Sequence, residues 1–371
     1  MKNSLRFGAI GVAAALMLAA CGQAPGSGSS TGGSGGQSGA ATESHSDVKA
    51  CMVSDSGGFE DKSFNQSGHE GLLKAKDELG VSVDQAESQA DSDYLPNLEN
   101  MVQGGCDVII GIGFMMAGAI TEVALKNPDV KFALVDSGFD ESQLGDGETL
   151  DNARALLFNT AEASYLAGYA AASMAESGKV GTFLGINLPS TAIFADGFSD
   201  GITKYNEEKG TDVKLLGWDK AKQDGMATGN FEDQSKGKQF TEQLFEQGAD
   251  VVMPVAGPVG LGALAAAKEA NKMIVWVDAD GVETQPDYAS VILTSVMKEI
   301  GAAVFDTIQS VIDGTFDATP YVGDLENGGV GIAPWHDFAD KIPADLDSEI
   351  DALRQGIIDG SIKVESVSTP K

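Results

Sequence analysis

Short apolar runs alternate with longer amphipathic segments from Val48 to Asp313. Runs of about four to eight apolar or β-branched residues that end in turn residues are typical of strands, and longer periodic segments are typical of helices. The expected strands are 48–55, 81–87, 107–111, 131–136, 153–158, 179–184, 213–218, 251–255, 273–277 and 291–295. The expected helices are 66–79, 94–103, 117–126, 162–176, 194–207, 231–247, 260–270 and 297–313. Strands separated by helices predict an α/β fold with parallel sheets covered on both faces.

These units fall into two α/β halves of similar pattern, and the length of the chain suits two domains. The first lobe takes residues 47–158 and, where the chain returns, about 282–318. The second lobe takes residues 159–281 and part of 319–365. The final stretch is expected to add an edge strand in GGVGIA and a helix over 350–358.

The N-terminus predicts export. Residues 1–20 combine a basic start, Lys2 and Arg6, with an apolar core that is short for a membrane span, as in a secretory signal peptide. The sequence Leu18-Ala-Ala-Cys-Gly22 fits a bacterial lipobox, in which Cys21 receives a lipid and becomes the mature N-terminus. The alternative is an ordinary signal peptide with a coincidental cysteine. Residues 21–46 are rich in Gly, Ser and Ala, and predict a flexible tether. We therefore expect a protein lipid-anchored on the extracytoplasmic face of the cell membrane.

The net charge and the cysteines give two further expectations, one about nucleic-acid partners and one about a disulfide. The formal net charge of −31 predicts repulsion from phosphate backbones, so no nucleic-acid partner is expected. Cys51 and Cys106 each lie at the start of a predicted strand. If these strands are neighbours in a parallel sheet, the two residues are close enough to form a disulfide in an exported protein. Two buried free thiols are the alternative.

The stretch SDSGGFEDKSFNQSGHEGL, residues 54–72, links the first strand to the first helix. Ligands of open α/β sheets bind at the carboxyl ends of such strands, where Asp55, Asp61, Ser63, Phe64 and Asn65 gather. An aromatic face beside hydrogen-bonding groups suits a flat polar ligand. Alternatively, Phe64 is a core residue, and Asp61 or Ser63 only caps the helix.

The same stretch resembles the signature of the basic membrane protein family, the substrate-binding lipoproteins of the PnrA purine-nucleoside receptor type. The resemblance continues almost to the end of the chain. It implies a type I periplasmic-binding-protein fold, with two doubly wound domains around a ligand cleft. It also implies a non-enzymatic receptor without a cofactor or metal, which delivers purine nucleosides to the permease and ATPase subunits of an ABC importer, these being separate chains.

The resemblance assigns ligand contacts residue by residue. In the first motif it implies a stacking ring at Phe64, a polar contact at Asn65 and a strand-end acid at Asp55. KFALVDS, GNFEDQSKGKQ and VMPVAGPVG imply Asp136, Phe231 and Gly257, and WVDAD and TSVMK imply the ribose-binding pair Asp278 and Lys298. Closure of the two domains would bring Phe64 and Phe231 onto opposite faces of the base.

Trp218 and the insertion 220–230 depart from the family pattern just before Phe231. Phe231 is alternatively a helix-start residue packed in the core, and Lys298 an exposed helix lysine. Asp136 and Asp278 are alternatively helix N-caps.

Two other functions compete. A sugar or another small metabolite would use similar stacking and polar contacts. The sequence Gly197-Phe-Ser-Asp-Gly201 matches the G-x-S-x-G elbow of serine hydrolases, with Ser199 as nucleophile and His336 as a partner in the right order. Because PSTAIFAD before it predicts a loop and helix start instead of a strand, the hydrolase is a remote alternative.

Overall fold

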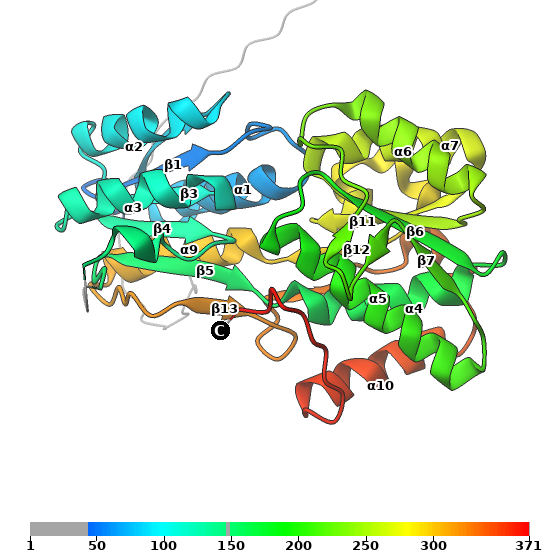
Figure 1. Cartoon of the computed structure of the whole chain (residues 1–371). Coiled ribbons are helices and arrows are strands. Elements are labelled where there is room, and N and C mark those ends of the chain that lie inside the picture. The colour runs from blue at the N-terminus through cyan, green and yellow to red at the C-terminus, as the bar shows by residue number, and fades with distance from the viewer. Residues whose placement is uncertain (1–43, 146–148, 371) are drawn as a thin grey trace, which may run out of the picture. The chain divides into compact units, whose positions relative to one another are not determined.

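The computed structural model of the chain describes residues 44–145 and 149–370. These residues belong to one compact unit, which contains two six-stranded sheets (Figure 1). The expected signal peptide (1–20), Cys21 and most of the expected tether (21–46) lie outside the described residues.

The first sheet is parallel throughout and has the strand order β13-β5-β4-β3-β1-β2. Its strands are β1 (Lys49–Ser54), β2 (Ser82–Glu87), β3 (Val108–Ile112), β4 (Lys131–Val135), β5 (Ala153–Phe158) and β13 (Tyr321–Gly323). Its helices are α1 (Phe64–Leu79), α2 (Tyr94–Gln103), α3 (Ala117–Lys126) and α9 (Ile300–Ile312). We call this sheet and its helices the first lobe.

The second sheet has the order β14-β12-β11-β10-β6-β7, in which only β14 is antiparallel to its neighbour. Its strands are β6 (Lys179–Leu184), β7 (Lys214–Leu216), β10 (Val251–Val255), β11 (Met273–Asp278), β12 (Ile292–Lys298) and β14 (Val330–Ile332). Its helices are α4 (Thr160–Met174), α5 (Pro189–Lys209), α6 (Gln234–Glu246), α7 (Gly260–Ala270), α8 (Gly281–Thr284) and α10 (Leu346–Ile358). A hairpin of β8 (Trp218–Asp219) and β9 (Asp224–Gly225) completes this second lobe.

The two doubly wound α/β domains confirm the predicted fold class. The expected edge strand and final helix are present as β14 and α10. The inner strands β1, β3, β4, β10 and β11 are buried almost throughout, as expected for sheets that carry helices on both faces, whereas the edge strand β2 is largely exposed. The disulfide between Cys51 and Cys106 joins β1 to the second residue before β3, as expected for two neighbouring parallel strands.

The chain passes between the lobes three times: from β5 to α4, from β12 to α9, and from β13 to β14. After the first two crossings, α4 packs on α5 of the second lobe and α9 packs on α1 of the first. The expected return of 282–318 to the first lobe is therefore too early, because β12 pairs with β11 in the second sheet. Only Glu299 lies between β12 and α9, and no Gly or Pro stands at this boundary, so the sequence pattern does not show where the strand ends.

The G-x-S-x-G glycines serve close helix packing. A Cβ atom on Gly197 would lie 2.2 Å from the carbonyl oxygen of Ala161, and one on Gly201 would lie 1.9 Å from that of Tyr165. Only glycine lets α5 approach α4 this closely. Ser199 lies inside α5, and His336 pairs with Asp280 (2.7 Å). No hydrogen bond among the described residues links Ser199 to His336, so the predicted hydrolase arrangement is not formed.

Candidate functional site

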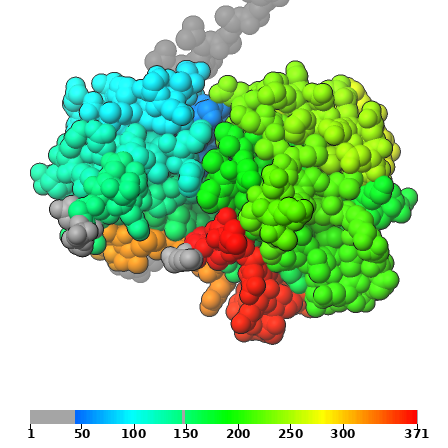
Figure 2. All heavy atoms as spheres, in the orientation of Figure 1, coloured from blue at the N-terminus to red at the C-terminus, as the bar shows by residue number. Residues whose placement is uncertain are grey.

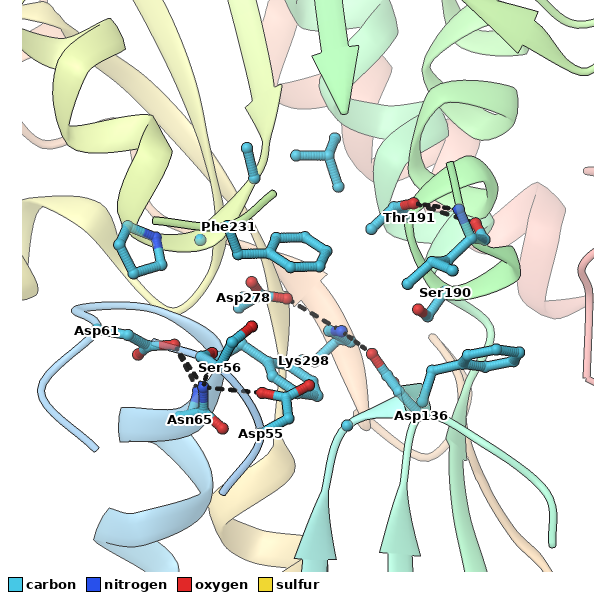
Figure 3. Close-up of a pocket in the computed structure, with 18 of the residues that line it drawn as sticks. Asp55, Ser56, Asp61, Asn65, Asp136, Ser190, Thr191, Phe231, Asp278 and Lys298 are labelled. Carbon is cyan, nitrogen blue, oxygen red and sulfur yellow. Dashed lines mark hydrogen bonds and ion pairs between the residues drawn. The ribbon is translucent and has the colours of Figure 1, made fainter. Parts of the chain in front are cut away.

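One pocket lies where the carboxyl ends of the two sheets meet, and residues of both lobes line it (Figure 3). The space inside it, including open solvent at the mouth, is about 550 Å³. All eight residues that the sequence analysis named as ligand contacts border it: Asp55, Phe64, Asn65, Asp136, Phe231, Gly257, Asp278 and Lys298.

Asp61 fixes the start of α1 and thereby places its first residues in the pocket wall. Its carboxylate accepts hydrogen bonds from the backbone N–H groups of Ser63 (3.0 Å), Asn65 (2.8 Å) and Gln66 (3.0 Å). These are the N–H groups that lack partners inside a helix, so Asp61 is the cap of α1. Phe64, the first residue of α1, is half-buried, borders the pocket and also packs on the core.

Asn65 and Asp55 form a buried polar pair beside this cap. The side-chain amide of Asn65 donates toward Asp55 Oδ1, the carbonyl oxygen of Ser56 and Asp61 Oδ2, each at 3.2 Å. Burial raises the pKa of Asp55 well above its usual range; the Asn65 hydrogen bond opposes this, and the charges of Asp61 and Asp136 add to it. The pocket therefore holds a carboxyl group that is poorly solvated and ready for a hydrogen-bonding guest.

Within the described ranges, Lys298 is the only lysine or arginine that borders the pocket, and it connects the lobes. Its Nζ lies 2.5 Å from Asp136 Oδ2 of the first lobe and 3.0 Å from Asp278 Oδ1 of the second (Figure 3). Burial alone would lower the pKa of Lys298, but these two carboxylates outweigh it and raise the pKa, so the amine stays charged. The alternative of an exposed helix lysine is wrong, since Lys298 is 3% exposed and ends β12.

The Lys298 ammonium also lies over aromatic rings. Its Nζ is 4.6 Å from the ring centre of Phe64 and 5.1 Å from that of Phe194. Both distances fit cation–π contacts, which are strongest where the cation is desolvated. These contacts fix the ring of Phe64 next to the charge.

Asp136 and Asp278 occupy corresponding places in the two sheets, after β4 and at the end of β11. Both have left-handed backbone conformations, with φ of 63° and 70°. Such backbones are uncommon for residues with a Cβ and gather at functional sites. Neither aspartate caps a helix, as the alternative required; Asp140 and Asp280 cap the next turns instead.

Asp278 also takes part in a second contact between the lobes. Ser63 Oγ lies 2.7 Å from Asp278 Oδ2 and 3.2 Å from the carbonyl oxygen of Val277. Ser63 is fully buried, so this contact is shielded from solvent. The pocket residues therefore also hold the two lobes together.

Phe231 reaches the pocket from a loop of the second lobe. It precedes α6, which begins at Gln234, so the expected helix over 231–247 starts too early. Asn230 Oδ1 accepts from the backbone N–H groups of Glu232 (3.0 Å) and Asp233 (2.8 Å), which closes a tight turn around Phe231.

The sequence analysis missed residues at the end of β6 and the start of α5. A Cβ atom on Gly185 would lie 2.4 Å from Cδ1 of Phe231, so this glycine makes room for the ring. Ser190, Thr191 and Phe194 border the pocket from α5, which begins at Pro189, five residues earlier than expected. A proline at the first turn is a recognised helix-start signal, and a glycine directly after a strand signals close approach.

Comparison with known proteins assigns the family. The family model described as "ABC transporter substrate-binding protein PnrA-like" (Bmp) matches residues 48–368. The chain belongs to this family. It is 30% identical to an "ABC transporter nucleoside-binding protein BmpA" of Lactococcus lactis, over 98% of this chain and 99% of that protein. It is also 30% identical to "Basic membrane protein A" of Borreliella burgdorferi, over 86% of this chain and 88% of that one.

Solved structures agree with this PnrA-like assignment. An ABC transporter solute-binding protein of Aeropyrum pernix K1 superposes with a TM-score of 0.76 at 27% identity, covering 87% of this chain and 94% of that one. A solute-binding protein of Conexibacter woesei gives a TM-score of 0.67 at 22% identity, with 86% and 99% coverage, and shows the shared fold. The chain is thus a substrate-binding protein of an ABC transporter, a class that works outside the cytoplasm and does not catalyse reactions. Within the described ranges, no helix is long and apolar enough to span a membrane.

Proposed function

We propose that this PnrA-like protein captures purine nucleosides in the cleft between its lobes and delivers them to the permease and ATPase of an ABC importer. One observation carries the proposal. Two phenyl rings from opposite lobes, Phe64 and Phe231, border one pocket together with strand-end carboxylates and one buried lysine. The name of the Lactococcus relative supports the nucleoside class.

The aromatic rings suit a purine base. A base presents two flat faces, and stacking on an aromatic side chain contributes about 1–3 kcal/mol for each base. Lys298 of the second lobe lies over the ring of Phe64, and Phe231 lies against Gly185 of its own lobe, so both rings are held in place. A base held between them would contact both lobes at once, and its binding would favour their closure.

The polar residues divide into two groups at different parts of the pocket. Asp55 and Asn65 form one group near the start of α1, suited to the polar edge of a base. Asp136, Asp278 and Lys298 form the other, suited to ribose hydroxyls, which donate to carboxylates and accept from an ammonium group. A nucleoside needs both kinds of contact together with the rings.

We further propose that Cys21 carries a lipid that anchors the protein to the membrane, with residues 22–46 as the tether. The lipobox pattern and the composition of this segment support this part of the proposal. Mass spectrometry of the mature N-terminus would detect the lipid, and an unmodified Cys21 in protein from the native membrane would contradict the anchor.

Calorimetric titration of the soluble domain with inosine, guanosine and adenosine tests the ligand class. We expect at least one nucleoside to bind with a stoichiometry of about one. Ribose and free hypoxanthine are the matched half-ligands, and each should bind far more weakly because it uses only one group of contacts. Heat from a sugar with none from any nucleoside would reject the proposal in favour of a sugar receptor.

A further inference from the structure

A second hollow adjoins the ligand cleft on the far side of Asp136. It shares Phe114, Asp136 and Ser190 with the cleft and has a space of about 540 Å³ including its mouth. Its other walls include Ser137, Thr160, Ile193, Ser368 and Pro370. We call it the side chamber. Because the two hollows share these lining residues, a guest held in the cleft lies next to the chamber.

The chamber is closed in part by the C-terminal segment 366–370, which we call the tail. In Figure 2 the tail, in red, lies on the surface where the two lobes meet. From residue 361 to residue 368, exposed and half-buried residues alternate along the chain. Val367 is 76% exposed, while Ser366 and Ser368 are half-buried. Alternation of this kind is typical of an extended chain that lays one face on the protein, and here it leads into a turn at Val367 and Ser368, where Thr369 N donates to Ser366 O (3.2 Å).

A buried carboxylate holds the start of the tail. Asp196 of α5 is fully buried and accepts from Ser366 Oγ (2.7 Å), Trp218 Nε1 (2.9 Å) and Gln223 Nε2 (2.9 Å). Hydrogen bonds to a charged, buried acceptor are among the stronger ones in proteins. Trp218 and Gln223 belong to the β8–β9 hairpin, the segment that departs from the family pattern.

The same hairpin also forms an ion pair next to the residues that lead into the tail. Lys220 Nζ lies 2.7 Å from Asp200 Oδ1 and also bonds the backbone oxygen of Glu365. Further along, this segment bonds β6 and ends at Phe231, through Thr228 N to Leu184 O (2.9 Å). One loop thus positions both the ligand-facing ring and the tail.

The chemistry of the chamber is neutral. Ser137, Thr160 and Ser190 supply hydroxyl groups, and the hydroxyl of Ser190 has no hydrogen-bond partner in the described part of the chain. Among the described residues of its lining, Asp136 is the one charged group, and it is already paired with Lys298. With no cation among these described residues, the chamber disfavours a phosphate group and favours an uncharged one.

Resting on the proposed nucleoside function, we propose that the side chamber receives an uncharged substituent on the ribose of the bound nucleoside. The tail sets the largest substituent that fits. Asp136 borders both the cleft and the chamber, and the proposed function places the ribose beside it. A group carried by the ribose therefore enters the chamber while the base stays between the rings. The receptor then takes ribose-alkylated nucleosides as well as the parent compounds.

The test compares dissociation constants for inosine, its O5′- and O3′-methyl and butyl ethers, and the phosphate at the same two oxygens. At one of these oxygens the methyl ether is expected to bind within about threefold of inosine. The phosphate at that oxygen should bind at least a hundredfold more weakly. Loss of more than thirtyfold for both methyl ethers would overturn the proposal while leaving nucleoside binding intact; no binding of inosine would overturn both.

Variants of the tail test its part. Ser368→Leu should increase the ratio of methyl-ether to inosine dissociation constants at least tenfold, because the larger side chain fills the chamber. A chain that stops after Val364 should lower the butyl-ether ratio at least tenfold. Val367→Ser, an exposed change in the same segment, is the matched control and should shift neither ratio by more than twofold. Equal ratios in Ser368→Leu and Val367→Ser would overturn the role of the tail.

Discussion

Replacing Lys298 by methionine removes the positive charge that the described residues place in the lining of the cleft, and keeps a side chain of similar length. In the native protein, Lys298 Nζ lies within 3.0 Å of Asp136 and Asp278 and is 3% exposed. Lys298→Met leaves two buried carboxylates from opposite lobes without a cation. The expected result is a less stable protein that also binds nucleosides more weakly.

The size of the effect follows from burial. Removing one partner of a buried ion pair costs about 3–5 kcal/mol in the free energy of unfolding, because the charge left behind is desolvated and unpaired. Loss of the ammonium donor weakens ligand binding by a further 1.5–3 kcal/mol or so, about ten- to a hundredfold, the contribution of hydrogen bonds to charged groups. The two effects are measured separately.

The deficit should depend on pH. Burial raises the pKa of Asp136 and Lys298 opposes this, so removing the lysine raises that pKa further. A carboxyl group whose pKa is higher in the folded than in the unfolded protein binds more protons when folded, and stability falls as pH rises between the two values. Lys298→Met should therefore lose less stability at pH 5 than at pH 8.

Urea unfolding followed by tryptophan fluorescence at pH 5, 7 and 8 measures this. Lys268→Met is the matched control, since Lys268 also lies over an aromatic ring, Tyr288 (5.1 Å), but is exposed. Adding Asp136→Asn to Lys298→Met should restore part of the stability by removing one unpaired charge. Equal stability of the Lys298→Met and Lys268→Met proteins, or no rescue by Asp136→Asn, would refute the buried ion network.

Three further predictions concern single side chains of the cleft. Phe64→Ala should weaken inosine binding by about 1–3 kcal/mol in calorimetry, while Phe316→Ala, a ring outside the pocket lining, should not; equal affinities would argue against stacking. Gly185→Ala should weaken binding by a similar amount with little change in melting temperature, because its Cβ displaces the ring of Phe231; unchanged affinity would show that the ring's position is unimportant. Asp55→Asn should raise the melting temperature of the ligand-free protein at pH 8 more than at pH 5, since burial raises the pKa of Asp55 and its ionised form penalises folding; the opposite pH trend in calorimetric scans would contradict this.

The strand-end rule explains how much of the site the sequence predicts. Asp55, Asp136, Gly257 and Asp278 follow or end apolar strands, and the carboxyl ends of parallel strands share one edge of a sheet. Their convergence on one pocket thus follows from local pattern together with the fold. The disulfide between Cys51 and Cys106 follows in the same way.

The path of the chain between the lobes could not be predicted from the local sequence pattern. Only Glu299 separates β12 from α9, and the turn at this residue has no Gly or Pro to mark it. Tertiary pairing of β12 with β11 and β14 decides where the strand ends. For this reason Lys298 was predicted to lie in a helix, although its prediction as a pocket residue was correct.

Contacts between distant segments account for the other omissions. Gly185 matters only because Phe231 lies against it, and Asp196 because Ser366, 170 positions later in the chain, donates to it. Residues 220–230 show no hydrophobic periodicity that predicts a hairpin. Their role in holding the tail depends on residues far away in the sequence. Such pairings require the folded chain.

A crystal structure of the protein with inosine tests the central claim most directly. The account predicts a purine between the rings of Phe64 and Phe231, with ribose hydroxyls within hydrogen-bond distance of Asp136, Asp278 and Lys298. Inosine bound outside this pocket, or bound within it with neither ring on a face of the base, would contradict the account.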